Sequence, residues 1–156
     1  MPRDDPRIAI VYDDARRSLD RQAQKLDELR SRAANVFTAA LLSGAFLGAR
    51  AVRPHPSRWA LAGVGALIVA GILSALVLVP RKGWRFSRSP SEMVKAYLDH
   101  EAMSDVDNML RAATMHLGED YESNASRFPP LTWLLRLSIL ALLIELALFL
   151  TALGVS

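Results

Sequence analysis

The stretch Trp59–Pro80, WALAGVGALIVAGILSALVLVP, contains no charged residue. It is 22 residues long, and as an α-helix rising 1.5 Å per residue it would measure roughly 33 Å. The hydrocarbon core of a bilayer is about 30 Å thick. Its only proline is the last residue, and Arg81 follows at once. We therefore expect residues 59–80 to form a membrane-spanning helix.

A second uncharged run, Ala33–Ala49, precedes this stretch. It is 17 residues long, the short limit for a span, and we place a first membrane-spanning helix at residues 33–52. Gly44 and Gly48 form a GxxxG pattern within it. Small residues four apart let two helix backbones approach closely in lipid, so this run is expected to pack tightly against another helix.

The second span carries a matching row of small residues at every fourth position, namely Ala62, Ala66, Ala70 and Ser74. We interpret the two rows as a helix-packing seam. It joins either two spans of one chain or two chains, and the sequence does not decide between them. The alternative is that alanine and glycine are simply common in such spans.

The link between the two spans, RAVRPHPSR at residues 50–58, is short and contains Pro54 and Pro56. Proline ends a helix because it lacks an amide donor and clashes with the preceding turn. A link this short favours an antiparallel pair of helices. We expect an external loop at residues 53–58, in which His55 is solvated.

The N-terminal region divides into a flexible tail at residues 1–12 and an amphipathic helix at residues 13–32 that continues into the first span. Asp13 or Asp14 is expected to cap the helix. Apolar and uncharged positions then recur in heptads, at Leu19, Gln22, Leu26, Leu29, Ala33 and Val36. This pattern predicts either a helix packed on its own chain or a short coiled coil with copies of the chain.

Residues 81–130 are expected to form a cytoplasmic amphipathic helical region. Ser89 and Glu92 are spaced as a capping box, and apolar residues follow at intervals of three to five from Val94 to Tyr121. Its polar face is acidic, with Asp99, Glu101, Asp105, Asp107, Glu119, Asp120 and Glu122. We predict that it packs beside the basic helix at residues 13–32.

No catalytic motif and no metal site emerge from the residue pattern. The cluster His100, Glu101, Asp105, His116 and Asp120 lacks the spacing of a known metal motif, so a solvated acidic face explains it better. The chain has no Cys, which excludes disulfides and thiolate chemistry. A net charge of +3 does not argue for nucleic acid. Ser43 stands without an intramembrane His, so we expect neither an enzyme nor a cofactor.

A third apolar stretch, residues 131–155, follows the helix-breaking sequence Phe128-Pro129-Pro130. Arg136 can extend its charged end to the near interface. Glu145 lies deeper, where an ionised carboxylate facing lipid is costly. It is expected to be protonated, hydrogen-bonded across helices or facing water. A functional role and a neutral structural hydrogen bond, to Thr38, Ser43 or Ser74, are equally consistent with the sequence.

The distribution of basic residues predicts the orientation. Lys and Arg number 8 in residues 1–32, 7 in residues 81–130 and 3 in the link 50–58. The positive-inside rule therefore places the N-terminus and the central region in the cytoplasm and the C-terminus outside. Aromatic residues favour the membrane interface, and we expect Trp59, Trp84 and Trp133 to act as interface anchors.

The layout resembles the small bacterial transmembrane effectors of the SLATT and Pycsar-TM type. The likeness covers residues 15–85 and rests on the charged helix running into a short span, LDELRSRAANVFTAALLSGAFLGA (Leu26–Ala49), followed by a hairpin. It implies an oligomer in the inner membrane that perturbs the bilayer, in antiphage defence, when a cytosolic signal such as a cyclic nucleotide arrives. No nucleotide-binding residues can be carried over, and the third span has no counterpart in this layout.

Together these features predict an all-α integral membrane protein with three transmembrane helices and a cytoplasmic helical layer. Its expected function is that of an oligomeric effector that perturbs or permeabilises the bacterial inner membrane. The alternative is a non-catalytic membrane scaffold or accessory subunit that docks a partner protein through its cytoplasmic helices. In both cases the lipid bilayer is the first partner.

Overall fold

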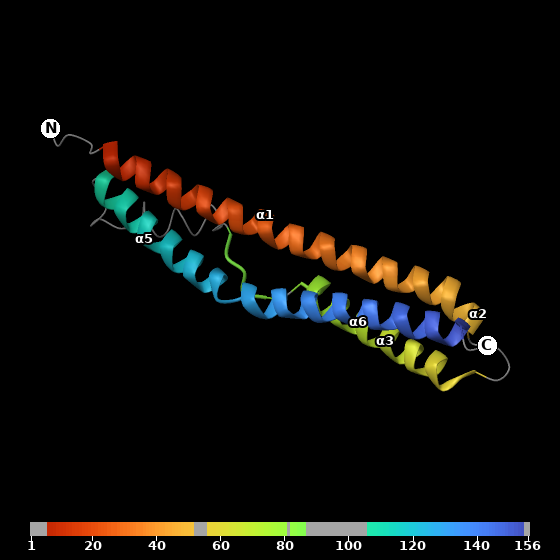
Figure 1. Cartoon of the computed structure of the whole chain (residues 1–156). Helices are drawn as coiled ribbons and strands as arrows, with labels where there is room; N and C mark the ends of the chain where they lie inside the picture. Colours follow the sequence, from red (N-terminus) through yellow and green to blue (C-terminus); the bar gives the residue numbers. More distant parts are fainter. Residues whose placement is uncertain (1–5, 52–55, 81, 87–105, 155–156) are drawn as a thin grey trace. The chain divides into compact units, whose positions relative to one another are not determined.

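A computed structural model of the chain describes residues 6–51, 56–80, 82–86 and 106–154. Each regular element within these ranges is a helix (Figure 1), as the all-α prediction required. The chain divides into two compact units. We call Met1–Leu26 with Arg81–Phe128 the charged unit, and Asp27–Pro80 with Pro129–Ser156 the apolar unit.

The first helix, α1, spans Pro6–Ser43 and contributes to both units. Proline suits the first turn of a helix, where its missing amide has no intrahelical partner to lose. The flexible tail expected at residues 1–12 is therefore wrong for residues 6–12, which are helical, while residues 1–5 lie outside the described ranges. Asp13 and Asp14, expected to cap the helix, lie exposed within it.

Five of the six predicted heptad positions form the buried stripe of α1, and the sixth, Val36, is half-buried. Leu19, Gln22 and Leu26 are buried in the charged unit, where the Gln22 Nε2 amide donates to the backbone oxygen of Tyr121 at 3.1 Å. Tyr121 belongs to helix α5, Val106–Ala125. The stripe thus packs on its own chain, and a coiled coil between copies stays a prediction.

The polar and apolar faces of α5 differ from the expected ones at several positions. Asp120 is only 4% exposed, although it was assigned to a solvated acidic face. Val106 and Tyr121, assigned to the apolar face, are exposed. Asp120 faces inward because the guanidinium of Arg85 lies 3.6 Å from its carboxylate. The capping box Ser89–Glu92 and the acidic residues Asp99, Glu101 and Asp105 lie outside the described ranges.

Two helices complete the apolar unit with α1. Helix α3 spans Arg58–Leu78 and is capped by Ser57, whose hydroxyl accepts from the amide of Ala60 at 3.2 Å. Helix α6 spans Phe128–Gly154. Pro129 and Pro130 stand in its first turn, where proline is tolerated. The helix break expected at Phe128-Pro129-Pro130 is confirmed, because α5 ends at Ala125 and α6 begins at Phe128.

Small side chains let the three helices approach closely. Ala40 of α1, Ala70 of α3 and Ala141 of α6 form one buried cluster, with Leu67 and Leu142 packed against it. Figure 1 shows α3 and α6 side by side in this unit. Because three alanines meet at this level, the backbones rather than long side chains determine the spacing of the helices.

The apolar unit has polar groups inside and apolar groups outside. Ser74, Ser138 and Glu145 are each 0% exposed. Large aliphatic side chains cover the outer surface of its helices, among them Leu41, Leu42, Leu61, Ile68, Ile72, Leu140, Leu143 and Leu150. Three helices, within Arg7–Ala51, Arg58–Leu78 and Val106–Gly154, are long and apolar enough to cross a membrane. These features are compatible with a multi-pass membrane protein.

Candidate functional site

Glu145 is enclosed in the middle of α6. The buried positions of this helix repeat every three or four residues and form one stripe, made of Leu131, Leu135, Ser138, Ala141, Glu145, Phe149 and Ala152. A stripe with this period faces neighbouring helices along its whole length. The carboxyl of Glu145 therefore points into the apolar unit and away from the surroundings of the protein.

The partner of Glu145 is Ser43, the last residue of α1. The Ser43 hydroxyl donates to Glu145 Oε1, and it also lies 3.1 Å from the backbone oxygen of Ala40. Glu145 Oε2 has no hydrogen-bond partner among the described residues. Of the three partners expected for Glu145, Thr38 is exposed and the hydroxyl of Ser74 is buried without a hydrogen-bond partner.

A π-helical segment, η1 at Gly44–Gly48, follows Ser43 directly. The spacing of the inward residues explains it. Leu19, Leu26, Ala33 and Ala40 are buried at intervals of seven, but the next fully buried residue, Gly48, comes eight residues after Ala40. Seven α-helical residues return a side chain to within about 20° of the same face. Eight would turn it about 80° away, so the wider π turn absorbs the extra residue.

The ring of Phe149 explains why Gly48 must face inward. A Cβ added to Gly48 would lie 3.2 Å from this ring, and one added to Gly63 of α3 would lie 2.8 Å from it. Phe149 is 0% exposed. The two glycines thus form a socket for the ring, which we call the Phe149 socket. Four residues before Gly48, a Cβ added to Gly44 would lie 2.7 Å from the side chain of Leu67.

The small-residue row of α3 needs correction. Ala70 and Ser74 are fully buried, but Ala66 is half-buried and Ala62 is exposed. The inward row instead includes Gly63, Ala70, Ser74 and Val77. Counting back from Ala70, positions 66 and 62 drift off the buried face because the α-helical period is 3.6 residues rather than four.

The charged and aromatic residues expected at the membrane interface fall into two groups. Trp59 and Trp133 are exposed, each with an arginine near its ring, Arg58 at 5.4 Å and Arg136 at 5.7 Å. Trp84 differs, because its ring stacks on Phe86 at 5.5 Å and meets the edge of Phe128 at 5.1 Å. Trp84 is therefore part of a packed aromatic cluster in the charged unit.

A hydrogen-bonded junction beside this cluster is visible only in the structure. Asn124 of α5 is 0% exposed. Its Nδ2 donates to the backbone oxygen of Arg85 at 2.8 Å, and its Oδ1 accepts from the Arg85 amide at 3.1 Å. Arg127 donates to the backbone oxygen of Lys82 at 3.0 Å. These bonds hold residues 82–86 against the C-terminal end of α5, and no sequence motif predicts them.

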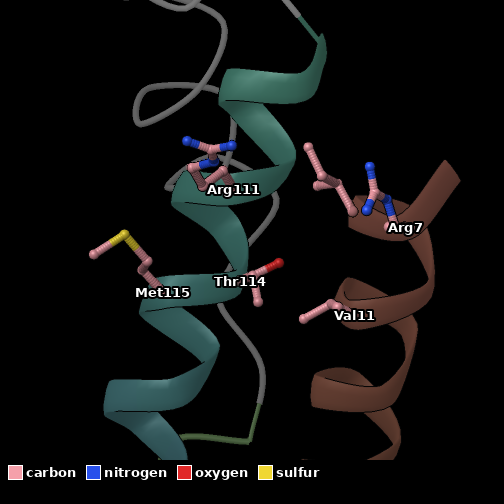
Figure 2. A pocket seen from close by; sticks show the side chains of 6 residues that line it. Arg7, Val11, Arg111, Thr114 and Met115 are labelled. Atoms are coloured by element: carbon pink, nitrogen blue, oxygen red, sulfur yellow. The ribbon is translucent and has the colours of Figure 1, made fainter. Parts of the chain in front are cut away.

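An apolar groove lies between α1 and α5 in the charged unit. It encloses about 250 Å³ and is lined by Arg7, Ile8, Val11, Arg111, Thr114 and Met115. Figure 2 shows Val11 and Thr114 facing each other across it, with Arg7 and Arg111 toward one end. Val11 and Met115 are largely exposed, so this groove is open to a partner.

Metal-binding groups do not gather in the part of the chain that the structure describes. No set of three or more histidine and carboxylate side chains there could hold a metal ion. His116 lies 3.5 Å from Glu119 on the same helix, while His100, Glu101 and Asp105 lie outside the described ranges.

The explanation of the π segment η1 predicts the effect of deleting one residue from it. Removing Ala45 shortens the Ala40-to-Gly48 spacing to seven residues, so η1 should become regular α-helix with Gly48 still against Phe149. We expect a small loss of stability in detergent unfolding. Removing Ile68 from regular α3 is the matched control. It turns the two parts of the helix about 100° relative to each other, so the loss of stability should be much larger. Equal damage from both deletions would contradict this account of η1.

Comparison with models of protein families, with curated proteins and with solved structures finds no match to this chain. The functional argument therefore depends on the residues and their geometry.

Proposed function

We propose that this protein is a multi-pass membrane effector that assembles into oligomers in the bacterial inner membrane and permeabilises it when a cytosolic signal reaches the charged unit. The three long apolar helices and their apolar outer surface support insertion into a bilayer. In water this surface would be a strong aggregation site, whereas in lipid it is the ordinary outer face of a helical bundle.

One observation carries the proposal, namely the contact between Ser43 and Glu145 beside the π segment η1. An ionisable residue buried among apolar helices is costly and usually serves a function. Single-turn π segments also occur often at functional sites. A repacking of α1 against α6 at this level would expose the carboxyl and open a polar path through the apolar unit.

The effector proposal is tested by expression in a bacterial host. Induction of the wild-type chain is expected to depolarise the inner membrane and stop growth, as read with a potential-sensitive dye. The combined substitutions Gly44→Leu, Gly48→Leu and Glu145→Ala should abolish both effects at an equal level of membrane-inserted protein. Gly65→Leu is the matched control, because nothing lies within 4 Å of a Cβ added there. Toxicity that survives the triple substitution would refute the role of the seam.

The orientation is tested separately from the activity. With the basic N-terminal and central segments in the cytoplasm, three spans place the C-terminus in the periplasm. A C-terminal alkaline phosphatase fusion should therefore be active and a C-terminal GFP fusion dark. The reverse pattern would overturn this topology.

The groove of the charged unit supports a second function, that of a membrane scaffold whose helices dock a partner protein. Its apolar lining and Arg111 suit an amphipathic segment with acidic residues. A stoichiometric complex that survives mild detergent purification, and that Val11→Asp with Arg111→Glu dissociates, would favour this function. Membrane depolarisation by the chain without any partner would favour the effector.

A further inference from the structure

The carboxyl of Glu145 is isolated from other charges. On α6 the nearest charged residue in sequence is Arg136, nine residues earlier and exposed. On α1 no charge occurs between Arg32 and Arg50, and on α3 Arg58 is the one charged residue. Neither oxygen of Glu145 forms an ion pair within the described residues, and only Oε1 has a hydrogen-bond donor. A buried carboxylate with a single neutral donor and no countercharge is strongly disfavoured.

The oxygen atoms around Glu145 are too few for a metal cation. The described contacts bring together Glu145 Oε1, the Ser43 hydroxyl and the backbone oxygen of Ala40. Hard metal ions such as Ca²⁺ take about six to eight oxygen ligands, and the alanine and leucine side chains packed at this level supply none. A proton needs only one oxygen, and Oε2 is without another partner.

We propose that Glu145 is a proton-binding site, and that the proton is the ion this protein passes across the membrane when the contact between α1 and α6 opens. The second half of this inference, proton transport, rests on the proposed function, whereas the first half, proton binding, does not. In the closed state the proton is bonded to Oε2 while Oε1 accepts from Ser43. On opening, the Oε2–H bond breaks, the proton passes to a water molecule, and the carboxylate remains. Reprotonation from water on the other side completes the transfer without any further reactant.

The position of Ser43 links this site to the π segment. Ser43 is the N-cap residue of η1, so any change in the winding of Gly44–Gly48 acts directly on the residue that holds Oε1. Removing the Ser43 hydroxyl should leave the carboxyl in place but free it from α1. We therefore assign Ser43 a positioning role and Glu145 the role of proton carrier.

The proton-binding half is tested with dicyclohexylcarbodiimide on the purified full-length protein in phospholipid vesicles. The carbodiimide nitrogen takes the proton of a neutral carboxyl, the carboxylate oxygen adds to its central carbon, and rearrangement gives a stable N-acylurea. One adduct mapped by mass spectrometry to Glu145 is expected, and Glu145→Gln should remove it. A water-soluble carbodiimide should not label this residue. Ser43→Ala should accelerate labelling several-fold. Absence of the Glu145 adduct in the wild type would overturn the assignment.

The transport half is tested in the same vesicles with an internal pH-sensitive dye and an imposed pH gradient. Ser43→Ala, which frees the carboxyl from α1 without the cytosolic signal, should dissipate the gradient faster than the wild type, and adding Glu145→Gln or carbodiimide treatment should reduce this proton flux at least tenfold. Glu145→Gln is nearly isosteric, and equal elution in size-exclusion chromatography verifies its fold. Undiminished proton flux in Ser43→Ala combined with Glu145→Gln would overturn the inference while leaving membrane permeabilisation intact. Labelling of Glu145 without any flux in Ser43→Ala would instead refute proton transport and retain the proton site.

Discussion

Replacing Phe149 by alanine is expected to lower the free energy of unfolding of the apolar unit by about 4 kcal/mol. The ring is fully buried and lies against Gly48 and Gly63. Because α1, α3 and α6 all contribute to this unit, truncation empties a space that side chains of the neighbouring helices cannot readily fill. The lost dispersion contacts have no substitute, since neither lipid nor water reaches an enclosed cavity of this kind. Unfolding in mixed micelles of increasing SDS content provides the measurement.

The glycines of the Phe149 socket provide the complementary test. Gly63→Ala places a Cβ 2.8 Å from the fully buried Phe149 ring, so the ring or the helices must shift at a cost of about 1–3 kcal/mol. Gly65→Ala, two residues away on the same helix, meets nothing within 4 Å. It should be neutral or stabilising, because alanine favours helix over glycine by about 1 kcal/mol.

A double substitution distinguishes a packed socket from two unrelated defects. In Gly63→Leu with Phe149→Ala, the leucine side chain can enter the space that the ring vacates. The double variant should therefore be more stable than the sum of the single effects, with a coupling energy between about 0.5 and 3 kcal/mol. Strict additivity would show that the ring and Gly63 do not pack as described.

The second large effect is expected at Asn124. Asn124→Ala removes both side-chain bonds to Arg85 and leaves the amide and the carbonyl oxygen of Arg85 without these partners. A typical hydrogen bond contributes about 0.5–1.5 kcal/mol net, so the loss of the two bonds should destabilise the charged unit by about 2 kcal/mol. The amide of Arg85 should at the same time exchange its hydrogen much faster.

Asn108 supplies the matched control for this variant. It lies on the same helix α5 but is exposed, so Asn108→Ala should change the stability by no more than about 0.5 kcal/mol. The loss of stability in Asn124→Asp should lie between those of Asn108→Ala and Asn124→Ala, because the aspartate keeps the acceptor for the Arg85 amide but loses the donor to the Arg85 oxygen. Unchanged exchange of the Arg85 amide in Asn124→Ala would contradict the junction.

Periodicity in the sequence predicted the faces of α1 well and those of α3 poorly. The heptad of α1 combines large apolar residues with charged ones, so the buried positions Leu19 and Leu26 stand out. In α3 almost every residue is apolar, and hydrophobicity cannot distinguish a side facing helices from one facing outward. The row through Ala62 and Ala66 was therefore predicted from residue size and a period of four residues. Packing selected Gly63 instead, because only glycine fits against Phe149.

Other features could not be inferred because they depend on residues distant in sequence. Ser43 and Glu145 are separated by 102 positions. In the sequence, Thr38, Ser43 and Ser74 are equally suitable hydrogen-bond partners for Glu145, and only the packing of the helices selects Ser43. Asn124 had no local signal, since its two bonds are to backbone atoms of a segment 39 positions away. The π segment η1 follows from the inward position of Gly48, which itself depends on α6.

The amino-acid sequence alone determined the helical class, the three long apolar segments and the buried stripe of α1. These properties depend on local composition and on the periods of the helix, which are readable along a single chain. The tertiary structure alone decided which face of α3 is buried, why α1 widens at Gly44–Gly48, and that Ser43 meets Glu145. Each of these depends on which side chains share one level of the helical unit, and that is a property of packing between helices.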